Sequence, residues 1–281
     1  MNTVRWGIIG CGAVTEVKSG PAFNKVESSA LVAVMRRNFL QAKDYATRHH
    51  AKYYYDDADK LIHNDQVDAI YIATPPSTHK EYALKVASAG KPCCIEKPMA
   101  LNYTECNEIL AAFSIPKIPL FVAYYRRSLP RFIKIKNWID TDAIGDVRHV
   151  HWSFSKPLNR YNLERRANWR TDPTIAGAGY FMDLASHGIN LFEFLIGEIK
   201  TAQGITTKQQ GLYKAEDAVS VCWQFENGGL GSGYWSFSAS NREDTVEIIG
   251  SKGNIKFSVF NDQPISLTNF GISKKRIDCT S

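Results

Sequence analysis

The chain begins with an apolar run that ends in two glycines, VRWGIIGCGAVT at residues 4–15. Such a run predicts a buried strand, and Gly10-Cys11-Gly12 stands where that strand would turn into a helix. Gly10 permits the tight turn, and Gly12 lets a phosphate approach the backbone. Thr15 replaces the third small residue of such turns, so we expect helix and strand to lie slightly further apart. The predicted pyrophosphate site is the backbone of Gly10, Cys11, Gly12, Ala13 and Val14.

The composition is that of a globular protein. The chain has 281 residues, 44% of them hydrophobic, and a formal net charge of +6. Its Lys and Arg residues are scattered, which argues against nucleic-acid binding and is compatible with an anionic cofactor. The six cysteines and the histidines show no metal-ligand spacing, so we expect reduced thiols, a cytoplasmic protein and no metal site. We see no leader and no apolar run long enough to span a membrane.

The first part of the chain alternates strand and helix signals. Strands that are buried on both faces read as continuous apolar runs, so these runs predict a parallel sheet with helices on both sides. Right-handed crossovers then give a doubly wound α/β domain, which we place at residues 1–124. The apolar runs are 4–9, 31–35, 69–73, 92–95 and 120–123, and the helical segments are 41–50, 79–89 and 102–113.

The pattern changes after about residue 125. Turn signals such as Asn227-Gly228-Gly229 separate alternating runs, which predicts an antiparallel sheet in an α+β domain at residues 125–281. Four aromatic residues on its strands, Trp223, Phe225, Trp235 and Phe237, either form an exposed dimer surface or are covered internally. The expected helices are 130–138 and 180–195, and the expected strands are 147–154, 218–225, 230–238, 245–250 and 254–258.

Two arginines follow the second apolar run. Units that bind NAD usually carry an acid here for the ribose 2′-hydroxyl, whereas this chain has Arg36 and Arg37. A guanidinium can pair with a 2′-phosphate and stack on adenine, so we predict NADP as the cofactor, with NAD as the alternative. The other interpretation of the pair is a solvated, basic strand end.

The loop ATPPSTH follows the third apolar run, at residues 73–79. Its prolines force an extended turn, and Ser77 or Thr78 can cap the next helix. Ligands of open α/β sheets bind at the carboxyl edge, where this loop lies. A plain capped turn is the alternative. The predicted cofactor-binding residues of the loop are Thr74, Pro75, Pro76 and His79.

These motifs, together with Glu96-Lys97-Pro98 and GAGYFMDLASH at residues 177–187, resemble the Gfo/Idh/MocA oxidoreductase family in order and spacing. The resemblance runs from Val4 to about residue 258. It implies a Rossmann domain, an open antiparallel sheet that often forms subunit interfaces, and pyridine-nucleotide chemistry on sugars or polyols. It therefore also implies a small carbohydrate-like substrate and a homo-oligomer formed through the C-terminal sheet.

The resemblance assigns roles to three residues. Lys97 of the Glu-Lys-Pro motif would contact the nicotinamide ribose and the reacting oxygen, where an ammonium can stabilise a developing alkoxide. Glu96 would belong to the cofactor site, and Pro98 would hold the turn. In the alternative interpretation, Lys97 and Glu96 are an exposed surface pair.

Asp183 and His187 are four residues apart in a helical pattern, so both project from one helix face. His187 has the pKa range needed to exchange a proton with a substrate hydroxyl, and Asp183 would orient substrate or histidine. Gly177 and Gly179 would let substrate or nicotinamide approach the backbone. Asn190 stands where many relatives have Asp.

Aromatic faces beside hydrogen-bonding side chains are typical of sugar sites. This favours Arg126, Trp169 and Arg170 as substrate residues, together with Asp183, although either arginine could equally pair with an acid of the chain. Tyr180 is a further substrate residue or a packing residue.

The sequence therefore predicts an NAD(P)-dependent oxidoreductase that interconverts a secondary alcohol and a carbonyl on a sugar, polyol or related diol. Lys97, Asp183 and His187 are the catalytic candidates. The alternatives are an NAD-dependent glycoside-cleaving enzyme and a non-catalytic nucleotide sensor of the same fold. Relatives commonly continue into a closing helix, whereas this chain continues as GISKKRIDCTS; either the chain is short or this segment is irregular.

Overall fold

The structure, a computed structural model, describes residues 3–269 and 272–277. Its contacts divide the chain into two units, which are residues 1–123 with 174–177 and residues 124–173 with 178–281. The sequence patterns did not anticipate that 174–177 belong with the first unit. The domain ranges 1–124 and 125–281 stay a prediction.

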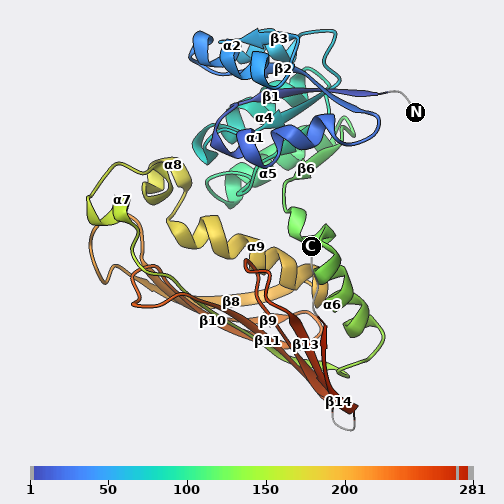
Figure 1. Ribbon diagram of the computed structural model, residues 1–281, viewed down its shortest axis with the longest axis vertical. Coiled ribbons are helices and arrows are strands. Elements are labelled where there is room, and N and C mark those ends of the chain that lie inside the picture. The colour runs from blue at the N-terminus through green and yellow to red at the C-terminus, as the bar shows by residue number, and fades with distance from the viewer. Residues whose placement is uncertain (1–2, 270–271, 278–281) are drawn as a thin grey trace. The chain divides into compact units, whose positions relative to one another are not determined.

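The first unit contains one six-stranded parallel sheet of order β3-β2-β1-β4-β5-β6, drawn in blue to green in Figure 1. From β1 the chain adds β2 and β3 on one side of the sheet and then β4, β5 and β6 on the other. This is the order of a doubly wound fold, so the predicted class is confirmed. All four residues of β4 are buried, as expected for a central parallel strand. The strands are β1 (Val4–Ile9), β2 (Ser29–Met35), β3 (Tyr53–Tyr55), β4 (Ala69–Ile72), β5 (Cys93–Ile95) and β6 (Leu120–Val122).

Helices cover both faces of this sheet. One apolar cluster joins the sheet to α3, α4 and α5, and a second joins it to α2 and the 3-10 helix η1. Asn38 and Asn102 begin α2 and α5 by accepting a backbone N–H three residues on. The helices are α1 (Ala13–Val17), η1 (Gly20–Asn24), α2 (Phe39–Arg48), α3 (Ala58–Ile62), η2 (Pro76–Thr78), α4 (His79–Ser88) and α5 (Tyr103–Ser114).

Two elements of the first unit differ from expectation. Strand β3 was missed because it is three half-buried tyrosines without an aliphatic run. Helix α1 is a single short turn of five residues. Its aligned peptide dipoles are therefore few. In the glycine turn before it, the Gly10 and Cys11 N–H groups donate to the Met35 carbonyl oxygen at 2.9 and 3.3 Å.

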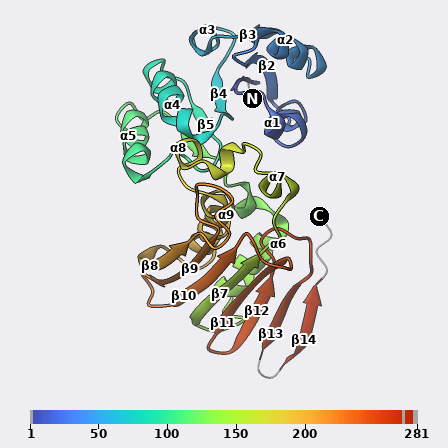
Figure 2. The ribbon, with the colours of Figure 1, turned by 90° about the vertical axis from the view of Figure 1, so that its left-hand side faces the viewer.

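The second unit contains an eight-stranded sheet of order β14-β13-β12-β11-β7-β10-β9-β8, which Figure 2 shows with its strands side by side. Its pairs are antiparallel except for β7 and β10, so the sheet is mixed and mainly antiparallel. The strands are β7 (Val147–Ser155), β8 (Ile199–Thr207), β9 (Ala218–Phe225), β10 (Leu230–Ser236), β11 (Glu243–Gly250), β12 (Gly253–Phe257), β13 (Ile265–Asn269) and β14 (Ile272–Ile277).

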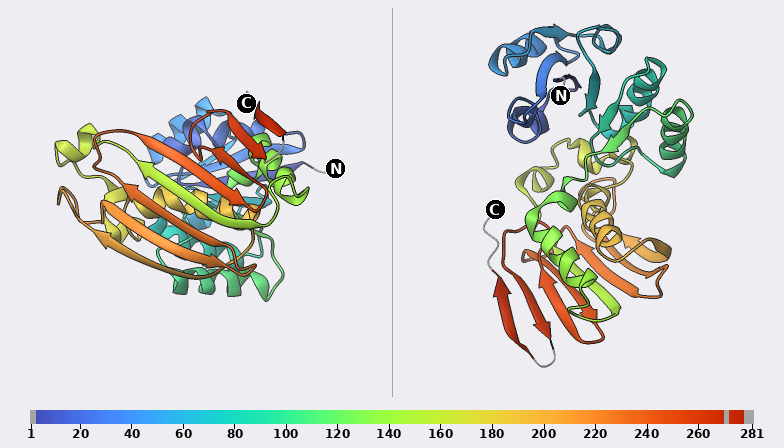
Figure 3. Two further views of the ribbon diagram at one scale, coloured as in Figure 1. Left: turned by 90° about the horizontal axis from the view of Figure 1, so that it is seen from below. Right: turned by 90° about the vertical axis from the view of Figure 1, so that its right-hand side faces the viewer.

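Helices α6 (Pro130–Asp140) and α9 (Tyr180–Leu195) pack on one face of this sheet. The sheet aromatics Trp223, Phe225, Trp235 and Phe237 are buried under them, so they are covered internally rather than exposed. Seen from below in Figure 3, left, the opposite face carries no helix among the described residues of this unit. The segments for which no helix was predicted contain the shorter helices η3 (Tyr125–Ser128), α7 (Arg160–Leu163), η4 (Trp169–Thr171) and α8 (Pro173–Ala176).

The two ends of the second sheet were not predicted. After Ile199, which is half-buried, every residue of β8 is exposed, so the strand shows no alternation of burial. Strand β14 pairs with β13, so part of the C-terminal segment is regular. The rest of that segment, residues 270–271 and 278–281, lies outside the described residues.

Gly188 permits the close packing of α9 against β7. A Cβ at this position would lie 2.2 Å from Cζ3 of the buried Trp152 ring. We expect Gly188→Ala to destabilise the protein by about 1–3 kcal/mol, because the clash outweighs the gain of about 0.5–1 kcal/mol from helix propensity. The free energy of unfolding in urea measures this. Gly12→Ala is the matched control, since its Cβ would meet only the Gly10 carbonyl oxygen at 3.9 Å; an unchanged Gly188→Ala midpoint would contradict the packing argument.

Candidate active site

The glycine turn after β1 leaves its outer side open. Gly10 has φ +93°, and a Cβ there would lie 2.9 Å from the Thr74 backbone nitrogen, so packing within the chain requires this glycine. Gly12 differs, because a Cβ there would meet nothing closer than 3.9 Å. The bare backbone at Gly12 thus fits a ligand that approaches from outside, as a pyrophosphate does in dinucleotide-binding units.

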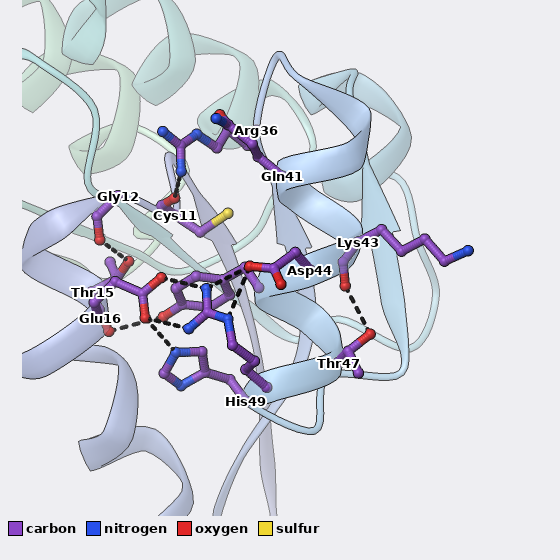
Figure 4. Close-up of polar contacts among 12 residues, drawn as sticks. Cys11, Gly12, Thr15, Glu16, Arg36, Gln41, Lys43, Asp44, Thr47 and His49 are labelled. Carbon is purple, nitrogen blue, oxygen red and sulfur yellow. Dashed lines mark hydrogen bonds and ion pairs between the residues drawn. The ribbon is translucent and has the colours of Figure 1, made fainter.

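Arg36 lies beside this turn, as Figure 4 shows. Its Nη1 donates to the Cys11 carbonyl oxygen at 3.3 Å, whereas Arg37 is exposed. The side chain of Cys11 is buried and points away from solvent, so only its backbone can contact a cofactor. Burial raises the pKa of the Cys11 thiol to about 11, although Arg36 acts the other way. A guanidinium held against the turn can meet a phosphate on the adenosine ribose.

The short helix α1 is held to α2 by a charged cluster. Both carboxylate oxygens of Glu16 accept from Arg48 at 2.7 Å, and His49 Nε2 lies 2.9 Å from Glu16 Oε2 (Figure 4). These hydrogen bonds from Arg48, and then from His49, lower the pKa of Glu16 to about 2. Thr15 is fully buried, and its hydroxyl donates to the Gly12 carbonyl oxygen at 2.9 Å. These polar contacts of Thr15 and Glu16 therefore hold the glycine turn and α1 in place.

His79 connects two loops. It is fully buried, with Nε2 2.8 Å from the Thr74 carbonyl oxygen and Nδ1 3.0 Å from the Pro98 carbonyl oxygen. Burial lowers the pKa of the imidazole, while these carbonyls act in the opposite direction. The imidazole therefore contacts only the chain itself in this structure, and His79 stays a predicted cofactor-binding residue.

The remaining residues of the ATPPSTH loop also bind mainly one another. The Thr78 hydroxyl lies 2.8 Å from Thr74 Oγ1 and 3.0 Å from the Pro75 carbonyl oxygen, so it does not cap α4 as expected. Pro76 is buried. Thr74 and Pro75 are half-buried and stay predicted cofactor residues.

Glu96 and Lys97 follow β5 in a turn with a cis Lys97-Pro98 peptide bond. The Glu96 carboxylate accepts from the Tyr71 hydroxyl and, at 3.2 Å, from the Lys97 backbone nitrogen. It therefore positions the loop and is not a solvated surface acid, and Glu96 stays a predicted residue of the cofactor site. Lys97 is half-buried and stays the predicted oxygen-binding lysine.

His187 lies on α9 with Asp183 one turn before it, as the spacing predicted. The imidazole is 7% exposed and meets three aromatic rings edge to face. Its ring centroid lies 5.9 Å from those of Tyr124, Tyr125 and Phe260. This arrangement restricts the imidazole to one orientation, which is what proton exchange with one substrate atom needs.

Arg126 contacts Phe260, one of the three rings around His187. Its guanidinium carbon lies 4.5 Å from the Phe260 ring centroid, and Nη1 donates to the Val259 carbonyl oxygen at 2.6 Å. Burial lowers the pKa of this guanidinium. The Arg126 guanidinium thus binds other parts of the protein, and the structure gives no support to Arg126 as a substrate residue.

The other four substrate candidates, Trp169, Arg170, Tyr180 and Asp183, fall into two groups. Arg170 Nε lies 3.5 Å from Asp183 Oδ2, and its guanidinium carbon lies 4.4 Å from the Trp169 ring centroid, so these residues form one group. Tyr180 is buried, and its hydroxyl accepts from Asn159 at 3.0 Å and Asn168 at 2.9 Å. It also lies 3.2 Å from Asn162 Oδ1, so its hydrogen-bonding capacity is used within the core. Tyr180 thus packs in the core, and its contact with a substrate stays a prediction.

One expectation about the start of α9 changes, and Asn190 inside the helix has a structural contact. Gly179 is required by packing, since a Cβ there would lie 2.8 Å from the Ala215 Cβ, and its N–H donates to Glu216 at 3.0 Å. It does not provide open backbone for a ligand. Asn190 accepts from Arg127 Nε at 2.6 Å, which ties η3 to α9.

Sequence reasoning missed Asp244, which organises this part of the molecule. Its buried carboxylate accepts from Trp152 Nε1 at 3.0 Å, from the Ser258 hydroxyl at 2.5 Å and from the Phe260 backbone nitrogen at 2.6 Å. The alternation of β11 carried a signal, because Asp244 shares its face with Val246 and Ile248. An acid on the core face of a strand predicts a buried polar network.

Comparisons with known proteins identify the family. Residues 4–124 match the model of an oxidoreductase family with an NAD-binding Rossmann fold, and residues 132–256 match the GFO/IDH/MocA C-terminal domain. Oxidoreductase P35 of Formosa agariphila is 42% identical over 258 residues, which are 92% of this chain and 80% of that protein. The chain belongs to the Gfo/Idh/MocA family. The predicted Rossmann fold, oxidoreductase class and dinucleotide cofactor are therefore confirmed.

A second relative and a similar solved structure are also informative. The scyllo-inositol 2-dehydrogenase (NADP(+)) IolU of Bacillus subtilis is 32% identical over 162 residues, 58% of this chain and 48% of that protein. The structure of levoglucosan dehydrogenase in complex with NADH matches with a TM-score of 0.88 and 23% identity, over 99% of this chain and 80% of that one. At this identity the likeness concerns the fold. In the part of the chain that the structure describes, no helix has the length and apolarity of a membrane span.

We expect His79→Phe to lower stability by about 2 kcal/mol and to weaken NAD(P)H binding. The change leaves the buried Thr74 and Pro98 carbonyls without their ring donor, and an unsatisfied buried polar group costs about 1–3 kcal/mol. Urea unfolding and cofactor fluorescence titration measure the two effects. His63→Phe, at an exposed histidine of the same unit, is the control. Unchanged stability of His79→Phe would show that the ring does not join the two loops.

Proposed function

We propose that this oxidoreductase interconverts a secondary alcohol and a carbonyl on a sugar, polyol or related diol. The observation that carries the proposal is His187, held edge-on by three aromatic rings and one helical turn from Asp183. Relatives named as inositol and levoglucosan dehydrogenases support the substrate class. A glycoside-cleaving enzyme, the first alternative, would leave the cofactor without net change. A nucleotide sensor, the second alternative, would have no use for Lys97, Asp183 and His187.

The bound nicotinamide supplies a carbon that accepts or donates hydride. In the oxidation direction, the His187 imidazole takes the proton of the substrate hydroxyl. For Lys97, in the first unit, we propose the role that the Glu-Lys-Pro motif implies, which is to stabilise negative charge on a reacting oxygen. Asp183, paired with Arg170, binds a neighbouring hydroxyl and orients the substrate. Trp169 offers an aromatic face for the C–H side of the ring.

We propose NADP as the preferred cofactor. The Arg36 guanidinium lies at the glycine turn, where NAD-binding units usually carry an acid, and Arg37 follows it with an exposed side chain. The backbone of Gly10, Cys11, Gly12, Ala13 and Val14 would bind the pyrophosphate. Thr74, Pro75 and Lys97 would contact the nicotinamide half.

Two broader proposals follow. We propose a homo-oligomer formed through the sheet face that no helix of the described residues covers, where Leu230, Tyr234 and Ile249 are exposed. The mass of the protein in solution tests this.

We also propose a cytoplasmic protein, since the five cysteines within the described ranges are free thiols, which persist in a reducing compartment.

We expect Arg36→Met to weaken NADPH binding by about 10- to 100-fold, because a charge-assisted hydrogen bond to the 2′-phosphate contributes about 1.5–3 kcal/mol. NADH, which lacks this phosphate, should bind about as before. Fluorescence titration of both nucleotides measures the difference. Lys43→Gln, at an exposed lysine of α2, is the control. Equal or tighter binding of NADH by the wild type would overturn the NADP assignment.

We expect His187→Asn to lower kcat on an accepted sugar or polyol by about 10²- to 10⁴-fold, the usual contribution of a positioned general base. NADPH affinity should stay within about twofold, since the change is confined to proton transfer. Nicotinamide absorbance with a sugar and polyol panel gives the rates. His149→Gln, on the uncovered sheet face, is the matched control. Full turnover by His187→Asn would refute its role as the base.

A further inference from the structure

The hydroxyl group of Tyr180, at the start of α9, is the centre of a hydrogen-bonded group of asparagines. It accepts from the Asn159 and Asn168 side-chain nitrogens at 3.0 and 2.9 Å, and it donates to Asn162 Oδ1 at 3.2 Å. A phenol hydroxyl has one proton to donate and two lone pairs to accept with, so these bonds use it completely. All three asparagines lie in the segment between β7 and α9, which also carries predicted substrate residues.

This segment inverts the usual order of burial. Along the single turn of α7, Asn162 is 4% exposed, whereas its neighbours Tyr161 and Leu163 are 58% and 61% exposed. A buried amide is stable only where its polar atoms find partners, and Tyr180 supplies one. The hydrogen bonds of Tyr180 therefore fix a turn whose apolar side chains face solvent.

Asn168 connects the same hydroxyl to the predicted substrate residues. Its side-chain nitrogen donates to Tyr180, and its side-chain oxygen accepts from the Arg170 backbone nitrogen at 3.2 Å, which begins η4. Trp169 and Arg170 project from η4, with the Arg170 guanidinium carbon 4.4 Å from the Trp169 ring centroid. Arg170 Nε lies 3.5 Å from Asp183 Oδ2, one turn after Tyr180 on α9. The start of α9 thus holds both the backbone of Arg170 and its side chain.

We propose that the Tyr180 hydroxyl is a positioning group for Trp169 and Arg170, and that it sets how tightly the site binds a sugar or polyol. This inference rests on the proposed function, because it concerns the substrate of the same site. Without the hydroxyl, the Asn168 side chain would lose its hydrogen bond to α9, and the backbone of η4 would be held less firmly. Side chains that are already in their binding geometry lose little entropy when a ligand arrives. The loss is therefore expected in substrate binding and not in hydride or proton transfer.

Tyr180→Phe removes the hydroxyl and keeps the ring. We expect KM for an accepted sugar or polyol to rise about tenfold or more, because one hydrogen bond is lost and its buried partners are left unsatisfied. The value of kcat and the NADPH affinity should stay within about threefold, since neither the transferred hydride nor the glycine turn is affected. Steady-state kinetics and cofactor fluorescence titration give these three quantities.

Tyr213→Phe is the matched control. The ring centroids of Tyr213 and Tyr180 lie 5.9 Å apart, and the buried Tyr213 hydroxyl makes no hydrogen bond within the described residues. Its removal should leave KM unchanged. The proposal is overturned if Tyr180→Phe has the wild-type KM, if it lowers kcat alone, if it weakens NADPH binding as much as substrate binding, or if Tyr213→Phe raises KM equally.

Asn168→Ala tests the route by which Tyr180 acts. It removes the same connection from the other side, so it should raise KM by a similar factor. Two changes that act through one connection are not additive, whereas independent changes multiply their effects. The double variant with Tyr180→Phe should therefore raise KM no more than the larger single change. A double variant whose KM rises by the product of the two factors overturns the connection through Asn168.

A measurement without turnover separates this inference from the proposed reaction. The nuclear magnetic resonance signal of the Trp169 indole N–H, identified by its absence from Trp169→Phe, reports the surroundings of that ring. We expect the signal to move in Tyr180→Phe and to stay in place in Tyr213→Phe. If no sugar or polyol is oxidised, the proposed reaction fails, and a signal that moves in this way still supports the positioning role. A Trp169 signal that is unchanged in Tyr180→Phe overturns that role.

Discussion

The buried carboxylate of Asp244 is the interaction on which the second unit depends most. A carboxylate out of contact with water is stable only where donors surround it, and here they come from β7 through Trp152 and from residues 258–260. Trp152 in turn lies against Gly188 of α9, and Phe260 lies against His187. One charged group thus fixes both the helix that carries the proposed base and one ring that orients it.

In the first unit, buried polar side chains hold the loops in place. His79 joins the loop after β4 to the loop after β5, and the Tyr71 hydroxyl binds Glu96 in the second of these loops. Lys97 follows Glu96, so the position of its backbone depends on side chains that bind other parts of the chain. In both units, residues that look catalytic by type are used to hold others in place, because buried polar groups specify a single geometry where apolar packing allows several.

The sequence predicted most of the architecture, because central strands and long helices carry strong periodic signals. It failed at Tyr53–Tyr55 and at β8, where the strands lack aliphatic or alternating residues. Within the site, residue type and spacing identified Asp183 and His187 on one helix face. They could not separate Arg170, which pairs with Asp183, from Arg126, which stacks on Phe260, since both are arginines beside aromatic residues. Only the tertiary structure determines what a guanidinium contacts.

The difference between these two arginines bears on specificity. Arg126 is desolvated, donates to a backbone carbonyl and stacks on an aromatic ring, so its charge is part of the framework around His187. Arg170 instead pairs with Asp183 at the start of α9, and the Trp169 ring lies against one side of its guanidinium. Aromatic contact of this kind orients a cation without neutralising it. The same residue type thus supports the framework around His187 in one place and pairs with the carboxylate of Asp183 in the other, so Arg170 rather than Arg126 stays the predicted substrate residue.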